Sequence, residues 1–351
     1  MSKIKTAILA ATGTVGQRFA SLLNDHPWFE VTVVTASEKS AGKRYTDAVN
    51  WVIPGDIPPN VANLTVQPTN DDLGDVLLVF SALPTAAARE IEPQLASAGY
   101  IVCSNASAMR MVDDVPLLVP EINYDHIGLI DAQRKNRGWD GLIVAAPNCS
   151  TTGTVFPLKI LHDAFGLEQG HIVTMQAISG AGYPGVASFD ILDNIMPYIG
   201  GEEEEKVETE PLKLLGTLNG GQIEFAGFTL SAQTHRVPVI DGHLAAISLK
   251  LRKKASIEQI IDAIESYQAP EAVRDLPSTP VKPVILRHEI DRPQPRRDRD
   301  AGDGMSISIG RVQPCSVFDV KLISLVHNTV RGAAGGAIHN AELLKVSGLI
   351  G

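Results

Sequence analysis

The sequence predicts an α/β protein that joins a Rossmann-type parallel sheet to an α+β domain with a mixed sheet. Short apolar runs alternate with helical stretches over the first 148 residues, and longer alternating runs with fewer helices follow. The chain has 351 residues, of which 44% are hydrophobic, so it is long enough to fill two cores.

The first domain begins with an apolar run at residues 7–9, a glycine turn, a helical stretch to Asn24 and a β-branched run at residues 31–35. This order predicts a βαβ unit. Further apolar runs follow at 76–80, 101–103 and 142–146, with a helical stretch at 86–98 between the first two. Strands that read as continuous apolar runs are typical of a parallel sheet covered on both faces.

The second domain contains the longer alternating runs at 171–177, 244–251, 305–312 and 317–326, which predict a mixed or antiparallel sheet. The Ala-rich stretch 328–346 has helical spacing, and we expect it to pack on the first domain. The predicted division is therefore 1–148, completed by 328–351, and 149–327. The acidic stretch 200–206 and the Pro-, Arg- and Asp-rich stretch 291–303 are interpreted as solvated surface.

Composition excludes several classes of function. The net charge is −10 and no Lys/Arg-dense stretch occurs, so nucleic acid is not an expected partner. The three cysteines form no CxxC pair, and no cluster has metal-ligand spacing, so neither disulfides nor a metal is expected. We find no signal-peptide pattern and no apolar run of about 18 residues, which predicts a cytoplasmic protein without a membrane segment.

A nucleotide loop is predicted between the first strand and the first helix, because backbone N–H groups there can bind a pyrophosphate. Compared with the usual G-x-G-x-x-G fingerprint, only the later glycines are present, and Ala10 or Ala11 stands where a glycine is common. A plain tight turn is the alternative. The loop residues predicted to bind the cofactor are Thr12, Gly13, Thr14, Val15 and Gly16.

The end of the second strand indicates which dinucleotide binds. Glu38 could accept the ribose hydroxyls of NAD, but Ser37, Ser40, Lys39 and Lys43 offer hydroxyl and cationic partners for a 2′-phosphate. We therefore predict NADP(H) as the cofactor.

Cys149 is the predicted nucleophile, because it lies between a buried strand and the start of a helix. A helix N-terminus there is expected to lower the thiol pKa, and its N–H groups with Asn148 can hold an oxyanion. Pro157 is expected to kink or shorten that helix. The acid/base partner is expected to be His243, which enters a strand after a glycine, with His235 as the alternative.

Six segments together give the chain a family resemblance. They are 11–17 (Ala-Thr-Gly-Thr-Val-Gly-Gln), 37–43, 147–151 (Pro-Asn-Cys-Ser-Thr), 176–185, 203–206 and 236–243. In this order they resemble the archaeal and fungal branch of the aspartate-semialdehyde dehydrogenase family over nearly the whole chain. Ala10 departs from the glycine usual there, and its methyl group could crowd the turn.

The resemblance implies a catalytic and dimerisation role for the second domain, a homodimer or homotetramer, and a role for each matching residue. Cys149 attacks the acyl phosphate and His243 is the acid/base. Arg236 clamps the substrate carboxylate with two parallel hydrogen bonds, a geometry that lysine cannot copy. The remaining implied roles are Glu203 for the substrate ammonium, Lys206 and Arg110 for phosphate, Gln176 and Asn148 for the acyl intermediate and its oxyanion, and Ser179, Gly180 and Asn328 for the cofactor.

The implied reaction is reduction of aspartyl 4-phosphate by NADPH through a Cys149 thioester, a step of aspartate-family amino-acid biosynthesis (the Thr, Met and Lys/Ile branches). One alternative is N-acetyl-γ-glutamyl-phosphate reductase, whose acylated amine does not need a carboxylate such as Glu203. A catalytically inactive NADP-sensing regulator and a cysteine hydrolase are the others.

Overall fold

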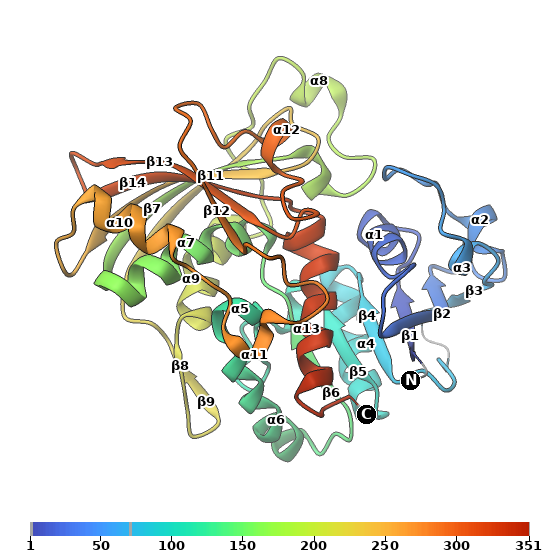
Figure 1. Ribbon diagram of the computed structural model, residues 1–351. Coiled ribbons are helices and arrows are strands. Elements are labelled where there is room, and N and C mark those ends of the chain that lie inside the picture. Colours follow the sequence, from blue (N-terminus) through green and yellow to red (C-terminus); the bar gives the residue numbers. More distant parts are fainter. Residues whose placement is uncertain (1–2, 70–71, 351) are drawn as a thin grey trace.

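The computed structural model describes residues 3–69 and 72–350, and its two six-stranded sheets lie side by side in Figure 1. The first sheet is entirely parallel, with strand order β3-β2-β1-β4-β5-β6, which is the order of a Rossmann fold. Its strands are β1 (Ile4–Leu9), β2 (Phe29–Ala36), β3 (Val66–Pro68), β4 (Leu78–Ser81), β5 (Ile101–Ser104) and β6 (Leu142–Ala145).

Helices connect these strands and cover the sheet (Figure 1). They are α1 (Thr14–Leu22), α2 (Tyr45–Ala48), α3 (Pro59–Ala62), α4 (Thr85–Ser97), η1 (Ser107–Met109), α5 (Pro120–Asn123), η2 (Tyr124–Gly128) and α6 (Leu129–Arg137). Strands β4, β5 and β6 are buried at every position, as their apolar runs predict.

The second sheet is mixed, with strand order β10-β7-β11-β14-β13-β12. Two of its pairs are parallel and three are antiparallel, so the predicted mixed sheet is confirmed. Its strands are β7 (Leu167–Gln176), β10 (Thr229–Arg236), β11 (His243–Leu251), β12 (Val284–Arg287), β13 (Ile307–Pro314) and β14 (Val320–Val326), and β8 (Thr217–Asn219) and β9 (Gln222–Glu224) form a separate hairpin. The accompanying helices are α7 (Cys149–Phe165), η3 (Ile178–Ala181), α8 (Ser188–Ile191), α9 (Glu203–Leu214), α10 (Ile257–Glu265), α11 (Glu271–Arg274) and α12 (Pro295–Asp298).

The chain returns to the first domain at its C-terminal end, where α13 (Gly335–Val346) contacts β5 and α1. The helix predicted from the spacing of residues 328–346 differs from the structure in its first turns. Residues Val330–Ala334 form a π-helical turn, η4, in which Ala333 has non-helical torsion angles (φ −148°, ψ −105°). Glycines at 332, 335 and 336 permit close packing there, and a Cβ at Gly332 would lie 2.8 Å from the Cβ of Cys149.

Helix α7 does not end at Pro157, contrary to the expectation from its sequence. A proline inside a helix leaves the carbonyl four residues earlier without its N–H donor. Here that carbonyl belongs to Gly153, and the Ser324 hydroxyl of β14 donates to it at 2.6 Å. The helix therefore continues to Phe165 because a neighbouring strand supplies the missing hydrogen bond.

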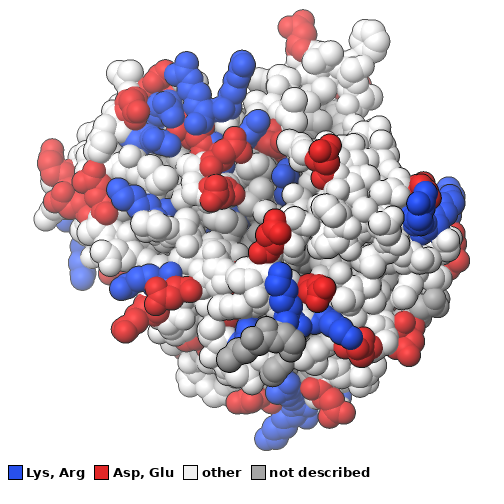
Figure 2. Space-filling model, turned by 45° about the vertical axis from the view of Figure 1, so that its right-hand side comes forward, with Lys and Arg blue, Asp and Glu red and all other residues white. Residues whose placement is uncertain are grey.

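The two segments interpreted as solvated surface are partly wrong. In the first, Glu204 accepts a hydrogen bond from the N–H of Thr234 on the edge strand β10, and Glu203 faces Asn148. In the second, the Asp298 carboxylate is buried. On the face shown in Figure 2 acidic and basic side chains are interspersed. Within residues 3–69 and 72–350, no helix is long and apolar enough to span a bilayer.

Candidate active site

The predicted nucleotide loop lies at the C-terminal edge of β1 and leads into α1. Gly13 occupies the N-cap position of α1 and brings no side chain to its first turn. A Cβ at Gly16 would lie 2.3 Å from the Ala10 carbonyl oxygen, so only glycine allows this approach. The loop therefore leaves the N–H groups of the first turn, from Thr14, Val15 and Gly16, open to a pyrophosphate.

Ala10 itself adopts a left-handed conformation with φ of 54°. A residue with a Cβ is strained there by about 1 kcal/mol, which explains why glycine is common at this point of the fingerprint. The turn nevertheless closes, because the Gly13 N–H donates to the Ala10 carbonyl at 3.1 Å.

The residues predicted for the 2′-phosphate follow β2 in a tight turn, in which the N–H of Ser40 donates to the Ser37 carbonyl at 2.8 Å. Ser37, Lys39 and Lys43 are exposed, and so is Glu38. Hydroxyl and ammonium groups thus gather at the edge of the sheet where the ribose of a bound dinucleotide lies.

The other predicted cofactor residues come from the second domain and face this loop. The Asn328 side chain donates to the Ser179 hydroxyl at 2.8 Å and accepts from the Gly242 N–H at 2.8 Å. The Tyr183 N–H donates to the Thr14 hydroxyl at 3.1 Å, which ties this segment to α1. Between them lies a cavity of about 170 Å³, lined by residues that include Thr14, Arg18, Ile178, Ser179, Asp241 and Thr329.

Cys149 is the first residue of α7, and Asn148 is the N-cap. The Asn148 side-chain oxygen accepts from the N–H groups of Ser150 (2.8 Å) and Thr151 (3.4 Å). Its amide nitrogen donates to both carboxylate oxygens of Glu203, at 3.0 and 3.1 Å. Asn148 therefore fixes the helix start that presents the thiol, and it links that start to α9.

The expected lowering of the thiol pKa is wrong for the protein without ligands. Burial, followed by the negative charge of Glu203, raises the pKa of Cys149 to about 12. Arg110, Arg236 and the N–H of Ser150 act in the opposite direction and do not outweigh burial.

His243 begins β11, and its ring is oriented by one hydrogen bond: the N–H of Ala177 donates to Nδ1 at 3.0 Å. Because Nδ1 accepts, the neutral ring carries its proton on Nε2, which is buried and has no partner among the described residues. Burial, followed by the charges of Arg236 and His327, lowers the pKa of His243 to about 3. His243 is therefore neutral and offers an Nε2–H donor.

Arg236 and Gly180 complete this side of the site. The Arg236 guanidinium donates to the Ala177 carbonyl through Nη1 at 2.8 Å. A Cβ at Gly180 would lie 2.8 Å from that nitrogen and 3.0 Å from Nε2 of His243. Gly180, a predicted cofactor residue, therefore packs against both Arg236 and His243. His235, the alternative base, precedes Arg236 in β10 and points to the opposite face of the strand.

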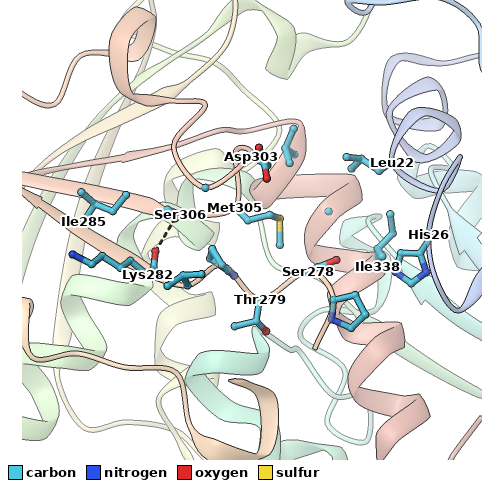
Figure 3. A pocket seen from close by; sticks show the side chains of 16 residues that line it. Leu22, His26, Ser278, Thr279, Lys282, Ile285, Asp303, Met305, Ser306 and Ile338 are labelled. Carbon is cyan, nitrogen blue, oxygen red and sulfur yellow. Dashed lines mark hydrogen bonds between the residues drawn. The ribbon is translucent and has the colours of Figure 1, made fainter. Parts of the chain in front are cut away.

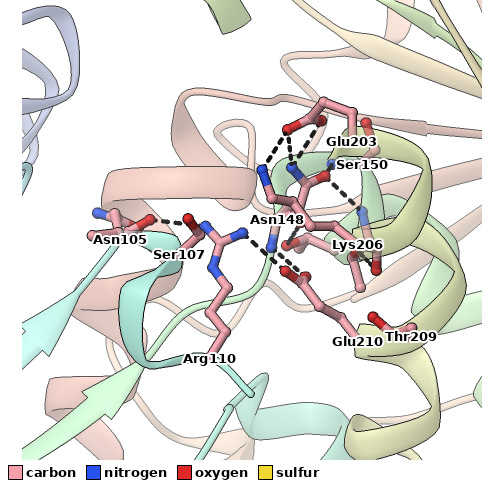
Figure 4. A network of polar contacts seen from close by, with 12 residues as sticks. Asn105, Ser107, Arg110, Asn148, Ser150, Glu203, Lys206, Thr209 and Glu210 are labelled. Atoms are coloured by element: carbon pink, nitrogen blue, oxygen red, sulfur yellow. Dashed lines mark hydrogen bonds and ion pairs between the residues drawn. The ribbon is translucent and has the colours of Figure 1, made fainter. Parts of the chain in front are cut away.

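One face of α9 supplies the opposite wall, shown in Figure 4. Glu203 accepts from Lys206 at 3.2 Å and from Gln176 at 3.4 Å, in addition to Asn148. Two turns further, the Glu210 carboxylate accepts from Arg110 Nη1 at 3.0 Å and from the Asn148 N–H at 2.7 Å. Asn148 therefore joins the contacts of Glu203 and those of Glu210 into one polar network.

Sequence reasoning missed Glu210 and Lys213. Lys213 is buried and donates to the carbonyls of Arg110, Val112 and Val115 at 2.7 to 2.9 Å. The signal was available: residues 203, 206, 210 and 213 are spaced by 3, 4 and 3, which places them on one helical face.

Several buried polar atoms near Arg110 have no hydrogen-bond partner among the described residues. They are Arg110 Nε, both side-chain amide atoms of Asn105 and the Ser150 hydroxyl oxygen. Buried polar groups are nearly always paired in folded proteins, so these atoms have hydrogen-bonding capacity for water or for a polar ligand. Arg110, Asn105 and Ser150 thus fit an anion beside the thiol.

Comparison with known proteins decides the family. The model of the semialdehyde dehydrogenase NAD-binding domain matches residues 5–130, and that of the semialdehyde dehydrogenase dimerisation domain matches residues 158–331. The aspartate-semialdehyde dehydrogenase of Archaeoglobus fulgidus is 51% identical over 342 residues, which cover 97% of this chain and 98% of the relative. The chain belongs to the aspartate-semialdehyde dehydrogenase family.

Two further proteins similar to this chain have names that mention NADP. The crystal structure of the Candida albicans aspartate-semialdehyde dehydrogenase with NADP superposes with a TM-score of 0.90 at 40% identity, covering 99% of this chain and 100% of that one. An NADP-dependent malonyl-CoA reductase from Metallosphaera sedula is 40% identical over 352 residues, covering 99% of this chain and 98% of its own. The prediction of an oxidoreductase with a nicotinamide dinucleotide cofactor is confirmed.

A separate cavity of about 610 Å³ lies between α1, α13 and the segment 277–285 (Figure 3). Its lining includes Leu22, His26, Lys282, Met305 and Ile338, and none of the predicted site residues.

Proposed function

We propose that the enzyme catalyses the reversible, NADPH-dependent reduction of L-aspartyl 4-phosphate to L-aspartate 4-semialdehyde, as a step in the biosynthesis of the aspartate-family amino acids. One observation carries this proposal. Glu203, bonded to the N-cap of the nucleophile helix, lies in a site that also holds Arg236 and Arg110. A substrate with an ammonium group, a carboxylate and an acyl phosphate matches these three side chains.

The cofactor would be held by residues of both domains. The open first turn of α1 suits the pyrophosphate, and Ser37, Ser40 and the neighbouring lysines suit a 2′-phosphate, which favours NADP over NAD. Ser179, Gly180 and Asn328 would face the nicotinamide end, because Gly180 lies against His243. When bound, the cofactor supplies the hydride that reduces the acyl group on Cys149.

The substrate would lie across the start of α7. Arg236 uses Nη1 for the Ala177 carbonyl, so its Nε and Nη2 edge is available for two parallel bonds to the carboxylate. Glu203 would accept the ammonium, and Gln176 beside it would orient the acyl group. Arg110 and Lys206 would hold the phosphate, and Asn105 and Ser150 would add hydrogen bonds from atoms that lack other partners.

Cys149 would displace phosphate to form a thioester, and its proton would leave on the departing phosphate. His243 would act mainly as an Nε2–H donor to charge on the sulfur and on the carbonyl oxygen, because the Ala177 N–H opposes a proton on Nδ1. Pairing of Glu203 with the substrate ammonium would remove one cause of the raised pKa of Cys149, so substrate binding itself would activate the thiol.

We also propose the arrangement of the whole enzyme: an NADP-binding domain of residues 1–148 completed by 328–351, a catalytic and dimerisation domain of residues 149–327, and a cytoplasmic homodimer or homotetramer. The dimerisation-domain match over residues 158–331 supports association through the second sheet. Sedimentation of the purified protein tests the oligomer.

Reduction of malonyl-CoA is the second candidate, because a relative with that activity is 40% identical. Malonyl-CoA has no ammonium group, so it would leave Lys206 as the cationic partner of Glu203. The test measures reduction of NADP at 340 nm with aspartate semialdehyde and phosphate. Parallel assays replace the substrate by N-acetylglutamate semialdehyde or the cofactor by NAD. A last assay measures oxidation of NADPH by malonyl-CoA. Activity with malonyl-CoA or the acetylated aldehyde in place of aspartate semialdehyde would reject the proposal, and a fully active Cys149→Ala variant would reject the thioester.

A further inference from the structure

The Pro-, Arg- and Asp-rich segment 291–303 is anchored by a buried ion cluster. Asp298, 1% exposed, accepts hydrogen bonds from Arg292 Nε and the Gln294 N–H, both at 2.6 Å, and forms an ion pair with Arg287 at 3.0 Å. The Ser306 hydroxyl, just after the segment, donates to the Lys282 carbonyl at 2.7 Å. The segment, which contains α12 at the top of Figure 1, is therefore held in one place at the end of the second sheet.

In this anchored position the segment contacts Asp241 and Gly242, the two residues before His243. Arg299 Nη1 donates to the Asp241 carbonyl at 3.0 Å. Gly242 has a φ of +102°, and a Cβ there would lie 3.1 Å from Pro295 Cβ and 3.3 Å from Arg299 Cβ. The Arg299 stem therefore packs on the Gly242 backbone while its guanidinium holds the preceding peptide.

The same peptide is held from the other side by groups of the active site. The Gly242 N–H donates to Asn328, which in turn donates to Ser179. The next residue is His243, whose ring accepts from the Ala177 N–H. The Asp241–Gly242 turn is thus held between Arg299 and Asn328, and these two contacts fix the backbone position from which the His243 side chain extends.

We propose that Arg299 is a positioning residue for His243, and that the ion cluster around Asp298 exists to keep it on the Asp241 carbonyl. Without that bond the Asp241–Gly242 turn is held from one side only, so it can shift and carry the imidazole with it. This inference rests on the proposed function, because it requires His243 to act on the reacting atoms. A misplacement of about 1 Å lowers turnover by roughly a hundredfold, so we expect kcat to fall about tenfold to a hundredfold.

The experiment compares Arg299→Ala, Arg299→Lys and Arg296→Ala in the full-length enzyme, with kcat and KM for aspartate semialdehyde and a melting curve for each. Arg296 lies in α12, whose C-cap residue is Arg299, and it has the same charge and is exposed, so it is the matched control. We expect Arg299→Ala to lose kcat with KM changed less than about threefold. Arg299→Lys restores most of kcat, because one ammonium donor can replace the single bond to Asp241.

Three outcomes overturn the inference: wild-type kcat in Arg299→Ala, equal losses in Arg299→Ala and Arg299→Lys, or an equal loss in Arg296→Ala. If Arg299→Ala does not fold, Arg299→Met replaces it, because its aliphatic stem still covers Gly242 while the hydrogen bond is lost. The wild type separates the two proposals: if it does not act on aspartate semialdehyde, the proposed function fails. If it acts and Arg299→Ala matches it, only the positioning role fails.

Discussion

Substitution of Glu203 by glutamine is expected to make the Cys149 thiol more reactive toward alkylation while lowering the turnover of the proposed substrate. The carboxylate is one of the two causes that raise the pKa of the thiol, after burial. Glutamine is nearly isosteric and can still accept a hydrogen bond from Asn148. The substitution therefore removes a negative charge near the sulfur and leaves the helix start in place, so the pKa of Cys149 falls.

The size of the effect follows from the thiolate population. With a pKa of about 12, only about one thiol in ten thousand is ionised at pH 8. Removal of one nearby like charge lowers a pKa by roughly 1 or more, which raises that fraction about tenfold. A thiolate of lower pKa is intrinsically less nucleophilic, with a Brønsted coefficient of about 0.4 to 0.5, so the alkylation rate rises about threefold to fourfold.

The assay measures iodoacetamide labelling of Cys149 against pH in a Cys315→Ser background. That background is needed because Cys315 is partly exposed and hydrogen bonds from backbone N–H groups lower its pKa, whereas Cys103 is fully buried. Glu205→Gln is the control, since Glu205 lies in the same helical turn and is exposed. An unchanged or slower rate in Glu203→Gln, with the control at the wild-type rate, would refute the coupling between Glu203 and the thiol.

Three further substitutions test the rest of the site. Gly16→Ala places a Cβ 2.3 Å from the Ala10 carbonyl, so we expect at least a tenfold rise in the NADPH dissociation constant, measured by fluorescence, with Cys149 labelling unchanged. Glu210→Gln removes the charge partner of the buried Arg110, so we expect a loss of about 3 kcal/mol in the free energy of unfolding, and a KM for phosphate raised about tenfold. Arg236→Lys keeps the charge but not the two parallel bonds, so kcat/KM for aspartate semialdehyde should fall about tenfold or more, and an unchanged value would remove Arg236 from the substrate site.

Strand prediction succeeded where burial alone determines the sequence and failed at the edges of the sheets. β4, β5 and β6 are buried on both faces and read as apolar runs. β10 was missed because it is an edge strand with alternate residues exposed, and its sequence contains Thr, Ser, Gln and His. The π-helical turn in η4 was missed because Ala-rich sequences have high helix propensity, and its distortion comes from packing against Cys149.

The features of the candidate site also divide into those that depend on a local stretch of sequence and those that depend on distant contacts. The start of a helix at Cys149 was predicted from the sequence and is present in the structure, because the strand-helix junction is a local feature. Its raised pKa was not predictable, because burial and the charge of Glu203 depend on contacts with α9. Glu210 pairs with Arg110 across 100 residues, and Arg299 contacts Asp241 across 58, so no local pattern indicates either pair.

The raised pKa of Cys149 and the neutral state of His243 together bear on the proposed choice of substrate. A cysteine with a permanently low pKa would react with any electrophile that reaches it. Here burial and the charge of Glu203 keep the pKa of the thiol raised, and Glu203, which Lys206 contacts at 3.2 Å, would gain a second cationic partner in a substrate ammonium. An ammonium-bearing acyl phosphate would therefore meet a more ionised thiol than malonyl-CoA would. Discrimination would thus arise in the chemical step as well as in binding, because the same carboxylate recognises the substrate and restrains the nucleophile.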